Sequence, residues 1–543
     1  MSIYKKYCTE QFDGNGRLSD IRVHYPDNFN FGYDVVDAIA RQDPGKRAMV
    51  WCNSEGDERI FTFGDISRLS NRAANVLRAA GIGRGDHVMV CLKRHYEYWF
   101  TAVALQKLGA VLIPVTHMLT VSDIVYRMGC IAIKAVICTP TGGIAGRMAE
   151  AAALTAPGCK FFTVRRALPG YEDLTAAMEQ AEETFGRQET AVTDPMLLYF
   201  TSGTTGYPKG VIHDFSYPLA HIITAKYWHR CFDGGLHFTV AETGWAKASW
   251  GKIYGQWLVG SAVMVFDFDN FDPKQLCTII NTYGVTSFCA PPTVYRYLAR
   301  KGIPDMPGLR HASAGGETLN PEVARRFTER TGLPICEGYG QTETSMLLGN
   351  ILGDENVVGS LGKPSPQYRI EIRDPDGSLT PAGQIGEIVV VPREDGKRPI
   401  GLFVGYLNDP ARYERVWEGG VYHTGDTAYV DENGCYFFHG RADDLIKTGG
   451  FRVGPSEVEN VLMEHDAVLE CAVVGIPDPL RGQAIKAYVI LNPGYAPDKD
   501  MEKELREFAN AKMAEYKWIR CIEFIDQIPK TISNKICKAA LRR

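Results

Sequence analysis

The sequence predicts an α/β fold with a large N-terminal domain of doubly wound sheets and a small α+β domain at the C-terminus. The first observation is length, because 543 residues exceed one ordinary domain of about 100–200 residues. The second is an alternation of strand-like and helix-like segments from residue 47 onward. Such alternation is typical of a parallel sheet with helices on both faces. The third is a change of pattern near residue 359 and again near residue 441.

The N-terminal part supplies the alternating elements. Continuous apolar runs predict buried strands, and apolar residues at helical spacing predict helices, with Gly81 as a stop for the first of them. The predicted strands are 48–52, 87–92, 111–115 and 135–138, and the predicted helices are 66–80, 96–108 and 122–130. A further apolar strand at 196–200 leads into a loop rich in glycine and hydroxyl groups.

The C-terminal third divides into two parts. Residues 359–440 are dense in Gly, Pro and Asp, with short strands such as 387–391, so β structure is expected there. After residue 441 a compact pattern predicts helices at 455–464 and 503–512 and strands at 469–474, 484–491 and 522–525. About 100 residues suffice for an independent domain. We therefore expect an N-terminal domain at 1–441 and a C-terminal domain at 442–543.

Composition and charge exclude several classes of protein. The net charge is −5 and the pI is near 6.2, which gives no electrostatic footprint for nucleic acid. The longest nearly apolar stretch, 257–266, is short of the roughly 20 residues that span a bilayer, so stable membrane insertion is not expected. The fourteen cysteines are dispersed singly, as in a reducing compartment. The N-terminus resembles neither a secretory signal nor a transit peptide, and a cytoplasmic location is expected.

The loop after the strand at 196–200 reads Thr201-Ser202-Gly203-Thr204-Thr205-Gly206-Tyr207-Pro208-Lys209-Gly210. Its glycines free backbone N–H groups, its hydroxyls add donors, and Lys209 adds a positive charge, all of which suit a polyphosphate. Because Gly210 follows Lys209, the spacing is not that of a P-loop. By composition alone an exposed turn without a ligand is equally acceptable. The ordered string, however, resembles the T-S-G-[TS]-T-G-x-P-K-G signature of the adenylate-forming superfamily, which includes acyl-CoA synthetases, beetle luciferases and adenylation domains of peptide synthetases.

Companion motifs follow in that superfamily's order. Residues 312–317 (Ala-Ser-Ala-Gly-Gly-Glu) and 337–344 (Glu-Gly-Tyr-Gly-Gln-Thr-Glu-Thr) resemble segments that line the adenine and acyl pockets. The resemblance implies that Tyr339 stacks on adenine, that Thr342 binds the α-phosphate and that Glu343 ligates Mg²⁺. An oxygen ligand from one carboxylate suits magnesium bound to a nucleotide. Alone, each motif would fit a tight turn or a solvated acid.

Three further matches lie toward the C-terminus. Residues 422–426 (Tyr-His-Thr-Gly-Asp) resemble the T-G-D motif, whose aspartate, here Asp426, accepts hydrogen bonds from the ribose. In residues 440–444 the resemblance places Arg441 at the ribose and makes Asp443 the pivot of a mobile C-terminal domain. Residues 529–536 resemble P-[KR]-T-x-[ST]-G-K-[IV], which makes Lys535 the lysine of adenylation. Asn534 departs from the usual glycine, although Asn tolerates a left-handed backbone best among other residues.

These motifs define the expected nucleotide site, in which Lys209, Thr342 and Lys535 carry the chemistry and Glu343 holds the metal. The expected ATP-binding residues are Thr201, Ser202, Gly203, Thr204, Thr205, Gly206, Lys209, Gly316, Glu317, Glu337, Gly338, Tyr339, Gly340, Gln341, Thr342, Asp426, Arg441 and Lys535.

The acid and thiol sites are inferred from two further resemblances. Thr243-Gly244-Trp245-Ala246-Lys247 is similar to a segment of acetyl- and medium-chain acyl-CoA synthetases. Gly340 stands where acetyl-CoA synthetases have a tryptophan that caps the pocket. Each buried methylene contributes about 0.8 kcal/mol, so a pocket opened at Gly340 favours longer, branched or aromatic acids, and Gly340→Trp is expected to favour acetate or propionate. The expected acyl pocket comprises Trp245, Ala314, Gly315, Gly340 and His221, with Trp257 as a further wall. Gly449, Gly450 and Phe451 are expected to line the CoA tunnel.

The resemblance therefore implies an ATP-dependent acyl-CoA ligase. A carboxylate oxygen attacks the α-phosphorus of ATP, pyrophosphate leaves, and the thiol of CoA then attacks the acyl-adenylate, with Mg²⁺ and the lysines neutralising charge. The expected partners are a small carboxylic acid, ATP and CoA, and a homodimer is compatible with the sequence. Three alternatives stay open: an adenylating enzyme that loads a carrier protein, a luciferase-like oxygenase, and a non-catalytic nucleotide or adenylate sensor, the last suggested by Asn534.

Overall fold

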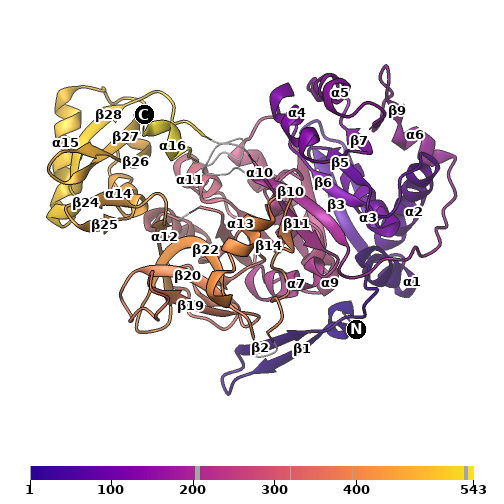
Figure 1. Cartoon of the computed structure of the whole chain (residues 1–543), viewed down its shortest axis with the longest axis horizontal. Helices are drawn as coiled ribbons and strands as arrows, with labels where there is room; N and C mark the ends of the chain where they lie inside the picture. The colour runs from indigo at the N-terminus through magenta and orange to yellow at the C-terminus, as the bar shows by residue number, and fades with distance from the viewer. Residues whose placement is uncertain (1, 202–207, 318, 394–395, 531–535, 543) are drawn as a thin grey trace.

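A computed structural model describes the chain except for residues 1, 202–207, 318, 394–395, 531–535 and 543 (Figure 1). The described residues form two large sheets, a smaller antiparallel sheet and a separate C-terminal body, preceded by an N-terminal hairpin of β1 (Cys8–Phe12) and β2 (Leu18–Val23). Among the described residues, no helix combines the length and apolar character needed to cross a membrane.

The first large sheet has a parallel centre and an antiparallel edge. In sheet order its strands are β21 (Gly405–Tyr406), β11 (Lys209–Asp214), β10 (Pro195–Thr201), β6 (Val111–Pro114), β5 (His87–Cys91), β7 (Ala135–Cys138), β8 (Lys160–Thr163) and β9 (Glu172–Asp173). β10 and β11 form an antiparallel hairpin in which Thr201 pairs with Lys209. This hairpin brings the two ends of the predicted phosphate loop together.

The second large sheet is parallel from β16 to β3. In sheet order its strands are β18 (Lys363–Pro364), β17 (Leu348–Gly349), β16 (Ile335–Tyr339), β15 (His311–Gly315), β14 (Ser287–Ala290), β12 (Leu236–Thr239), β13 (Ala262–Asp267), β3 (Arg47–Asn53) and β4 (Glu58–Thr62). The predicted strand at 48–52 is therefore present, but β3 lies in this sheet, between β13 and β4, and not in the first sheet beside β5.

Helices separate and cover the two sheets (Figure 1). They are α1 (Ala38–Gln42), α2 (Phe63–Ala79), α3 (Glu97–Leu108), α4 (Val121–Cys130), α5 (Ile144–Thr155), α6 (Leu174–Glu179), α7 (Tyr217–Ile223), α8 (Ala246–Gly251), α9 (Tyr254–Val259), α10 (Pro273–Thr282), α11 (Pro292–Lys301), α12 (Pro321–Thr331) and α13 (Pro410–Arg415). The largest apolar cluster joins buried residues of both sheets with those of α2, α3, α7 and α9.

Helix α3 shows how the sequence positions this core. All twelve of its residues are buried, as expected for a helix enclosed on every side. Its buried Glu97 forms a bidentate ion pair with Arg165, at 2.6 and 2.9 Å, and its Lys107 ammonium lies 2.7 Å from Asp37. Buried charges need such partners. The helix ends at Gly109, whose φ of 74° is easily adopted by glycine.

The predicted β-rich region contains a four-stranded antiparallel sheet. Its strands, in order, are β19 (Arg369–Arg373), β20 (Gly386–Val391), β22 (Tyr422–Val430) and β23 (Tyr436–Arg441). β23 ends at Arg441, where the C-terminal body begins.

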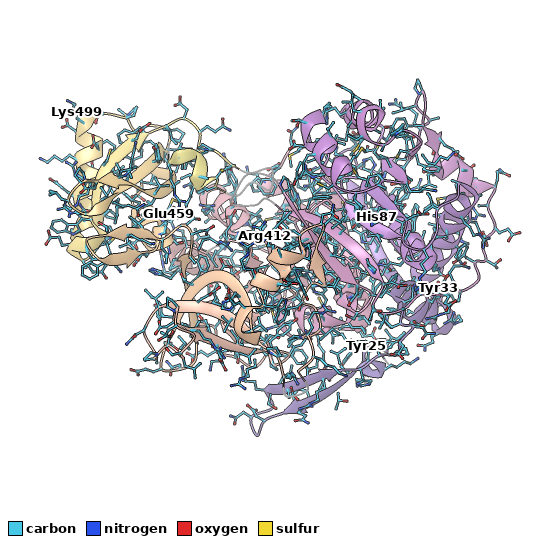
Figure 2. All side chains as sticks on the ribbon, in the orientation of Figure 1. Tyr25, Tyr33, His87, Arg412, Glu459 and Lys499 are labelled. Carbon is cyan, nitrogen blue, oxygen red and sulfur yellow. The ribbon has the colours of Figure 1, made fainter. Side chains whose placement is uncertain are left out.

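The C-terminal body lies at one end of the molecule (Figure 1). Its strands, in order, are β25 (Phe451–Val453), β24 (Ile446–Thr448), β27 (Gly482–Leu491) and β26 (Val468–Asp478), with β28 (Ile519–Phe524) on β27. Its helices are α14 (Pro455–Leu462), α15 (Lys499–Ala511) and α16 (Lys538–Leu541). Glu459, labelled in Figure 2, accepts hydrogen bonds from Lys538 at 2.7 Å and from the Val473 N–H at 2.8 Å, which ties the chain end to this sheet.

Candidate active site

The predicted motifs meet because β15 and β16 are parallel neighbours. Gly315 is paired with Gly338 at the carboxyl ends of these strands, so the segments that follow each strand emerge at the same edge. Ligands of open α/β sheets bind at the carboxyl ends of strands. The segments predicted to line the nucleotide and acyl pockets therefore converge there.

Asp426 of β22 collects three donors from the predicted motifs. The Tyr339 hydroxyl and the Gln341 amide each donate to Asp426 Oδ2 at 2.6 Å. Arg441, which faces Asp426 across β22 and β23, brings its Nη1 to 3.2 Å from Oδ1. The Tyr422 hydroxyl donates to the Gln341 oxygen at 2.8 Å, which fixes the orientation of that amide. Asp426 is only 5% exposed, so this carboxylate is held in one position.

The predicted metal ligand, Glu343, lies against Lys209. Lys209 Nζ is 2.6 Å from Glu343 Oε1, and the Tyr406 hydroxyl donates to the same oxygen at 2.9 Å. Burial alone would raise the pKa of Glu343, but the Lys209 ammonium and these hydrogen bonds hold that pKa below its usual value. Glu343 therefore stays an ionised carboxylate in a buried setting.

Two threonines complete the polar surface between the sheets. The Thr201 hydroxyl, at the start of the predicted phosphate loop, is buried and has no hydrogen-bond partner among the described residues. The Thr342 carbonyl accepts a hydrogen bond from His213 Nε2 at 2.7 Å. Burial lowers the pKa of His213 to about 4, so the ring is neutral and Nε2 carries the donated proton. Sequence reasoning did not single out His213, although it follows Lys209 by four residues in β11.

The structure turns two of the expected ATP ligands toward the protein. The Glu317 carboxylate accepts from the Thr293 hydroxyl of α11 at 2.9 Å and lies 3.5 Å from Arg296. Glu337 is 4% exposed and accepts from the Leu319 N–H at 3.2 Å. Burial raises the pKa of Glu337 to about 8. The hydrogen bond from Leu319 to Glu337 therefore connects β16 to the segment that follows β15.

The glycines of the two motifs have different surroundings. A Cβ built on Gly316, whose φ is 103°, would meet no atom within 4 Å, so this position faces open space. A Cβ on Gly338 would lie 2.4 Å from the Trp228 indole, and one on Gly340 would lie 2.5 Å from the Trp250 indole and 2.4 Å from the Ser345 carbonyl oxygen. Gly338 and Gly340 are therefore required by close packing.

This packing corrects the predicted role of Gly340. We expected the absence of a side chain at Gly340 to open the acyl pocket, but the indole of Trp250 already occupies the space beside it. A tryptophan at position 340 would also collide with the Ser345 backbone. The Gly340→Trp substitution is thus expected to disrupt packing and not to shift acid preference. Trp250, in α8, is the indole at this position.

The other expected acyl-pocket residues divide between wall and core. Ala314 is fully buried and precedes Gly315, the last residue of β15, and Trp245 is half-buried at the start of α8. His221 is fully buried in α7, with its ring 5.8 Å from that of Trp250. Trp257 is core, because its indole packs on Phe31 and Phe63 and donates to the Ala48 carbonyl.

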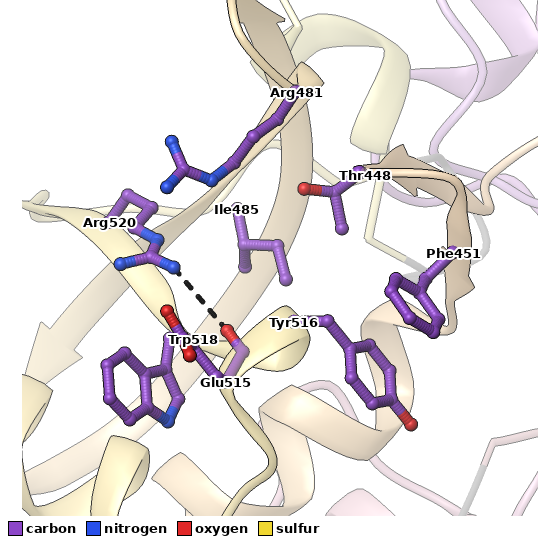
Figure 3. A pocket seen from close by; sticks show the side chains of 9 residues that line it. Thr448, Phe451, Arg481, Ile485, Glu515, Tyr516, Trp518 and Arg520 are labelled. Atoms are coloured by element: carbon purple, nitrogen blue, oxygen red, sulfur yellow. Dashed lines mark hydrogen bonds between the residues drawn. The ribbon is translucent and has the colours of Figure 1, made fainter.

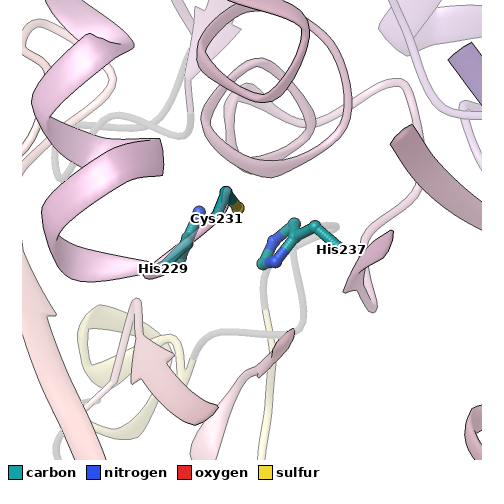
Figure 4. A group of neighbouring side chains, drawn as sticks. All are labelled: His229, Cys231 and His237. Carbon is teal, nitrogen blue, oxygen red and sulfur yellow. The ribbon is translucent and has the colours of Figure 1, made fainter. Parts of the chain in front are cut away.

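Behind this wall lies a buried group of His229, Cys231 and His237 (Figure 4). Their ligand atoms lie within 4.8 Å of one another, so we tested whether they suit a metal ion. The two imidazoles are stacked, with centroids 4.3 Å apart and planes 24° apart, and an ion cannot lie in the plane of two stacked rings at once. Both ring nitrogens of His237 also form hydrogen bonds already, one with the Ser287 hydroxyl and one with the Thr239 hydroxyl. The group does not fit a metal centre.

The predicted CoA residues lie on the hairpin of β24 and β25. Gly449 and Gly450 have positive φ angles of 56° and 85°, as the two central residues of a tight hairpin turn require. Gly449 and Phe451 border a hollow of about 360 Å³. Figure 3 shows Arg481 and Arg520 on one side of this hollow and Phe451 stacked on Tyr516, at 4.3 Å, on the other.

The predicted pivot joins the sheets to the C-terminal body. Asp443 Oδ1 lies 3.2 Å from Arg441 Nε, and Arg542 pairs with the Asp444 carboxylate. In α11, Arg300 donates to the Leu469 carbonyl at 3.0 Å. Of these contacts, the hydrogen bond from Arg300 to Leu469 connects the C-terminal body to α11.

Several predicted residues lie outside the described part of the chain. They are Ser202, Gly203, Thr204, Thr205 and Gly206 of the phosphate loop, and Lys535.

Comparison with known proteins matches two family models to this chain. "AMP-binding enzyme" matches residues 36–397 and "AMP-binding enzyme C-terminal domain" matches residues 457–535. Rat acyl-coenzyme A synthetase ACSM3 is 36% identical over 561 residues, covering 100% of this chain and 95% of the rat protein. Human acyl-coenzyme A synthetase ACSM4 is 37% identical over 531 residues, covering 95% and 90%. The crystal structure of the anthranilate CoA ligase AuaEII with anthranoyl-AMP has a TM-score of 0.86 at 27% identity, covering 95% and 97%.

These relatives correct the expected location. Both the rat and the human synthetase are named as mitochondrial. The cytoplasmic location expected from the sequence is therefore contradicted, and the similarity points to mitochondria.

Proposed function

Because this chain belongs to the AMP-binding enzyme family, we propose that the strand-end site built around Asp426 and Glu343 is its nucleotide site. The chain is an AMP-forming acid–thiol ligase, which joins a carboxylic acid to CoA through an acyl-adenylate at the expense of ATP.

The observation that carries the assignment is the convergence of Tyr339, Gln341 and Arg441 on one carboxylate. A carboxylate offers about four lone-pair sites on two oxygens, which suits the paired hydroxyls of a ribose. We place the ribose beside Asp426, with Arg441 sharing Oδ1. The adenine then lies along Tyr339, whose hydroxyl is neutral because burial and Asp426 raise its pKa.

The phosphates are assigned to the gap between β10 and the segment after β16. There the Thr201 hydroxyl has no described partner, and Lys209 and Thr342 lie on the neighbouring elements. In the first step a carboxylate oxygen attacks the α-phosphorus and pyrophosphate leaves. Two anions must approach, so Lys209 stabilises the charge that develops on the phosphate oxygens. The hydrogen bond from His213 Nε2 to the Thr342 carbonyl holds Thr342 in place.

Magnesium fits the same gap. Glu343 is an ionised, buried carboxylate, and carboxylate oxygen together with nucleotide phosphates is the ligand set that Mg²⁺ prefers. Glu343 would hold the ion, which would neutralise phosphate charge when bound. Lys209 balances that carboxylate at 2.6 Å and would also be within reach of the phosphates of a bound nucleotide.

The thiol step is assigned to the C-terminal body. We divide the chain into domains at 1–441, with its β-rich part at about 359–440, and 442–543, with Asp443 as the pivot. Rotation about Asp443 would withdraw Lys535 and bring Gly449, Gly450 and Phe451 to the acyl-adenylate. The hollow beside Phe451 suits the nucleotide end of CoA, because Arg481 and Arg520 offer guanidinium donors to phosphates and Tyr516 offers a stacking face.

For the acid, the proposal keeps a medium-chain, branched or aromatic carboxylate, in line with the relatives. Its alkyl or aryl part would lie beside the carboxyl ends of β15 and β16, where the indoles of Trp228 and Trp250 fill the space next to Gly338 and Gly340. Trp250, and not Gly340, then limits how far the acid extends.

Acid-dependent exchange of pyrophosphate into ATP, measured without CoA, tests the proposed site. Wild-type protein should catalyse this exchange with a preferred acid, and CoA should then yield AMP and a thioester. Asp426→Ala should raise the KM for ATP by about tenfold or more, because it removes a charged hydrogen-bond partner of the ribose. An exposed control, Asp305→Ala, should leave that KM unchanged. An unchanged KM in both variants would remove Asp426 from the site.

A further inference from the structure

Residues 403–407 bridge the proposed phosphate site, because their backbone bonds to both of its sides. On one side, the Phe403 N–H donates to the Glu343 carbonyl at 2.8 Å. On the other side, the Leu407 N–H donates to the carbonyl of Gly210 at 2.8 Å, directly after the phosphate-loop lysine in β11. This segment therefore connects the carboxylate that would hold magnesium with the strand that carries the lysine.

Tyr406 supplies the polar side chain of this bridge. Its hydroxyl accepts a hydrogen bond from Lys209 Nζ at 3.2 Å and donates one to Glu343 Oε1 at 2.9 Å. Lys209 Nζ itself lies 2.6 Å from the same oxygen, so the three groups form a closed triangle. Because both donors contact Oε1, neither of them occupies Oε2. The hydroxyl thus fixes the relative position of the two charges without covering the second carboxylate oxygen.

Packing holds the Tyr406 ring, and with it the hydroxyl, in one orientation. Tyr406 is buried, and its ring centre lies 4.6 Å from that of Phe403, whose ring packs edge-on against Tyr422 at 5.8 Å. The Lys209 ammonium lies 4.7 Å and the Arg412 guanidinium 5.6 Å from the centre of the Tyr406 ring, and cations are attracted to aromatic faces. A side chain that is locked in this way can orient the groups it contacts.

We propose that Tyr406 is a positioning residue for adenylate formation, which holds the Lys209 ammonium and the Glu343 carboxylate in the arrangement that receives the phosphates of ATP. The proposal rests on the proposed function, since it assumes that Lys209 and Glu343 act on the nucleotide. Tyr406 acts through these two residues. Thioester formation from the acyl-adenylate follows the departure of pyrophosphate, so that step should not depend on the Tyr406 hydroxyl.

The first test is Tyr406→Phe, which removes the hydroxyl and keeps the ring. The kcat of acid-dependent exchange of pyrophosphate into ATP should fall by about tenfold to a hundredfold, as loss of a hydrogen bond to a charged group does. Conversion of supplied acyl-adenylate and CoA to the thioester should keep its wild-type rate. Unchanged exchange, or equal losses in the two half-reactions, would overturn the proposal.

Tyr171→Phe is the matched control. The buried Tyr171 hydroxyl donates to the Ala145 carbonyl at 2.7 Å, beside β9, which lies at the opposite edge of the first sheet from β21. This variant should match the wild type in both half-reactions. A loss of exchange as large as that of Tyr406→Phe would show that any buried hydroxyl has this effect, and would overturn the proposal.

A second test asks whether the hydroxyl acts through its partners. In a Glu343→Gln background, Tyr406→Phe should add little further loss of exchange, because the interaction that the hydroxyl supports has already been removed. Losses that multiply as independent factors would overturn the proposal.

Binding of ATP without acid, measured by calorimetry, gives a readout apart from turnover. Magnesium should tighten ATP binding by the wild type, and this gain should be about tenfold smaller in Tyr406→Phe, as loss of a hydrogen-bond partner of a metal ligand predicts. Tyr171→Phe should keep the full gain. An undiminished gain in Tyr406→Phe would overturn the proposal. Failure of the wild type to exchange pyrophosphate with any acid would instead overturn the proposed function.

Discussion

The nucleotide end and the acyl end of the site are built in different ways. At the nucleotide end, hydrogen bonds between polar side chains of short motifs fix the geometry, with Tyr339, Gln341 and Arg441 on Asp426. At the acyl end, bulky side chains from another part of the chain pack against glycines. Trp228 packs against Gly338, and Trp250 packs against Gly340. The first end is specified by polar residues of short motifs that lie at strand ends, although the motifs themselves are 85 or more residues apart. The second end is specified by tertiary packing.

This difference predicts that changes at the nucleotide end affect every acid equally, whereas changes at the acyl end affect acids unequally. On the proposed assignment, the chemistry common to all substrates takes place beside β16 and β22. The choice of acid is assigned to the place where α8 meets the strands β15 and β16.

The largest effect is expected from Glu343→Gln. It removes the charge that pairs with Lys209 and that would hold magnesium, and loss of one such electrostatic group lowers rates by about a hundredfold to a thousandfold. Adenylate formation, followed by pyrophosphate release, should fall by this factor for all acids tested. The exposed Glu414→Gln is the matched control. A loss confined to some acids would break the distinction between the two ends.

Gly340→Ala should be the next most damaging change. Its Cβ would lie 2.4 Å from the Ser345 carbonyl oxygen and 2.5 Å from Trp250, and overpacking of this kind costs about 1–3 kcal/mol. Urea unfolding should show that loss of stability. Gly405→Ala, where a Cβ meets no atom within 4 Å, provides the comparison, and equal stability of the two variants would contradict the packing described here.

Trp250→Leu should change acid preference without stopping the reaction. Removing part of the indole opens space beside Gly340, and one methylene in an apolar pocket is worth about 1–3 kcal/mol in discrimination. The ratio of kcat/KM for a longer straight-chain acid to that for a shorter one should rise by about tenfold. Trp257→Phe, in the core, should lower stability but leave this ratio unchanged. A constant ratio in both variants would place the pocket elsewhere.

The smallest effect is expected from Glu337→Gln, measured as stability against pH. Burial raises the pKa of Glu337 from 4.5 to about 8 in the folded protein. The folded state therefore binds the proton more tightly than the unfolded state, and the stability from this group is lost as pH rises from about 4.5 toward 8. The stability of the variant relative to the wild type should therefore be greater at about pH 8 than at about pH 5, because only the wild type must give up this proton or keep a buried charge as the pH rises. A pH-independent difference would contradict the buried acid.

Much of the fold and of the nucleotide end could be predicted from the sequence. Apolar runs located strands such as β5 and β7, and the motifs located Tyr339, Asp426 and Arg441, because a strand end and its following turn are encoded by adjacent residues. The order of the strands could not be predicted in the same way, because β3 lies in the second sheet, where it pairs with β13. The N-terminal hairpin and His213 were also missed.

The acyl wall could not be predicted because its residues show no pattern of their own. Trp228 ends the π-helical segment Thr224–Trp228 and Trp250 lies in α8, and only packing brings them to Gly338 and Gly340. The sequence showed that Gly340 lacks a side chain but not that Trp250 occupies the space. A missing side chain predicts a cavity only when the neighbouring elements are already placed.

The most direct test of the central claim follows an oxygen atom. Acid labelled with heavy oxygen in its carboxylate is converted with ATP and CoA, and AMP and pyrophosphate are analysed by mass spectrometry. If the carboxylate attacks the α-phosphorus at the Asp426–Glu343 site, one labelled oxygen should appear in AMP and none in pyrophosphate. Label in pyrophosphate or inorganic phosphate, or AMP without label, would contradict the acyl-adenylate route.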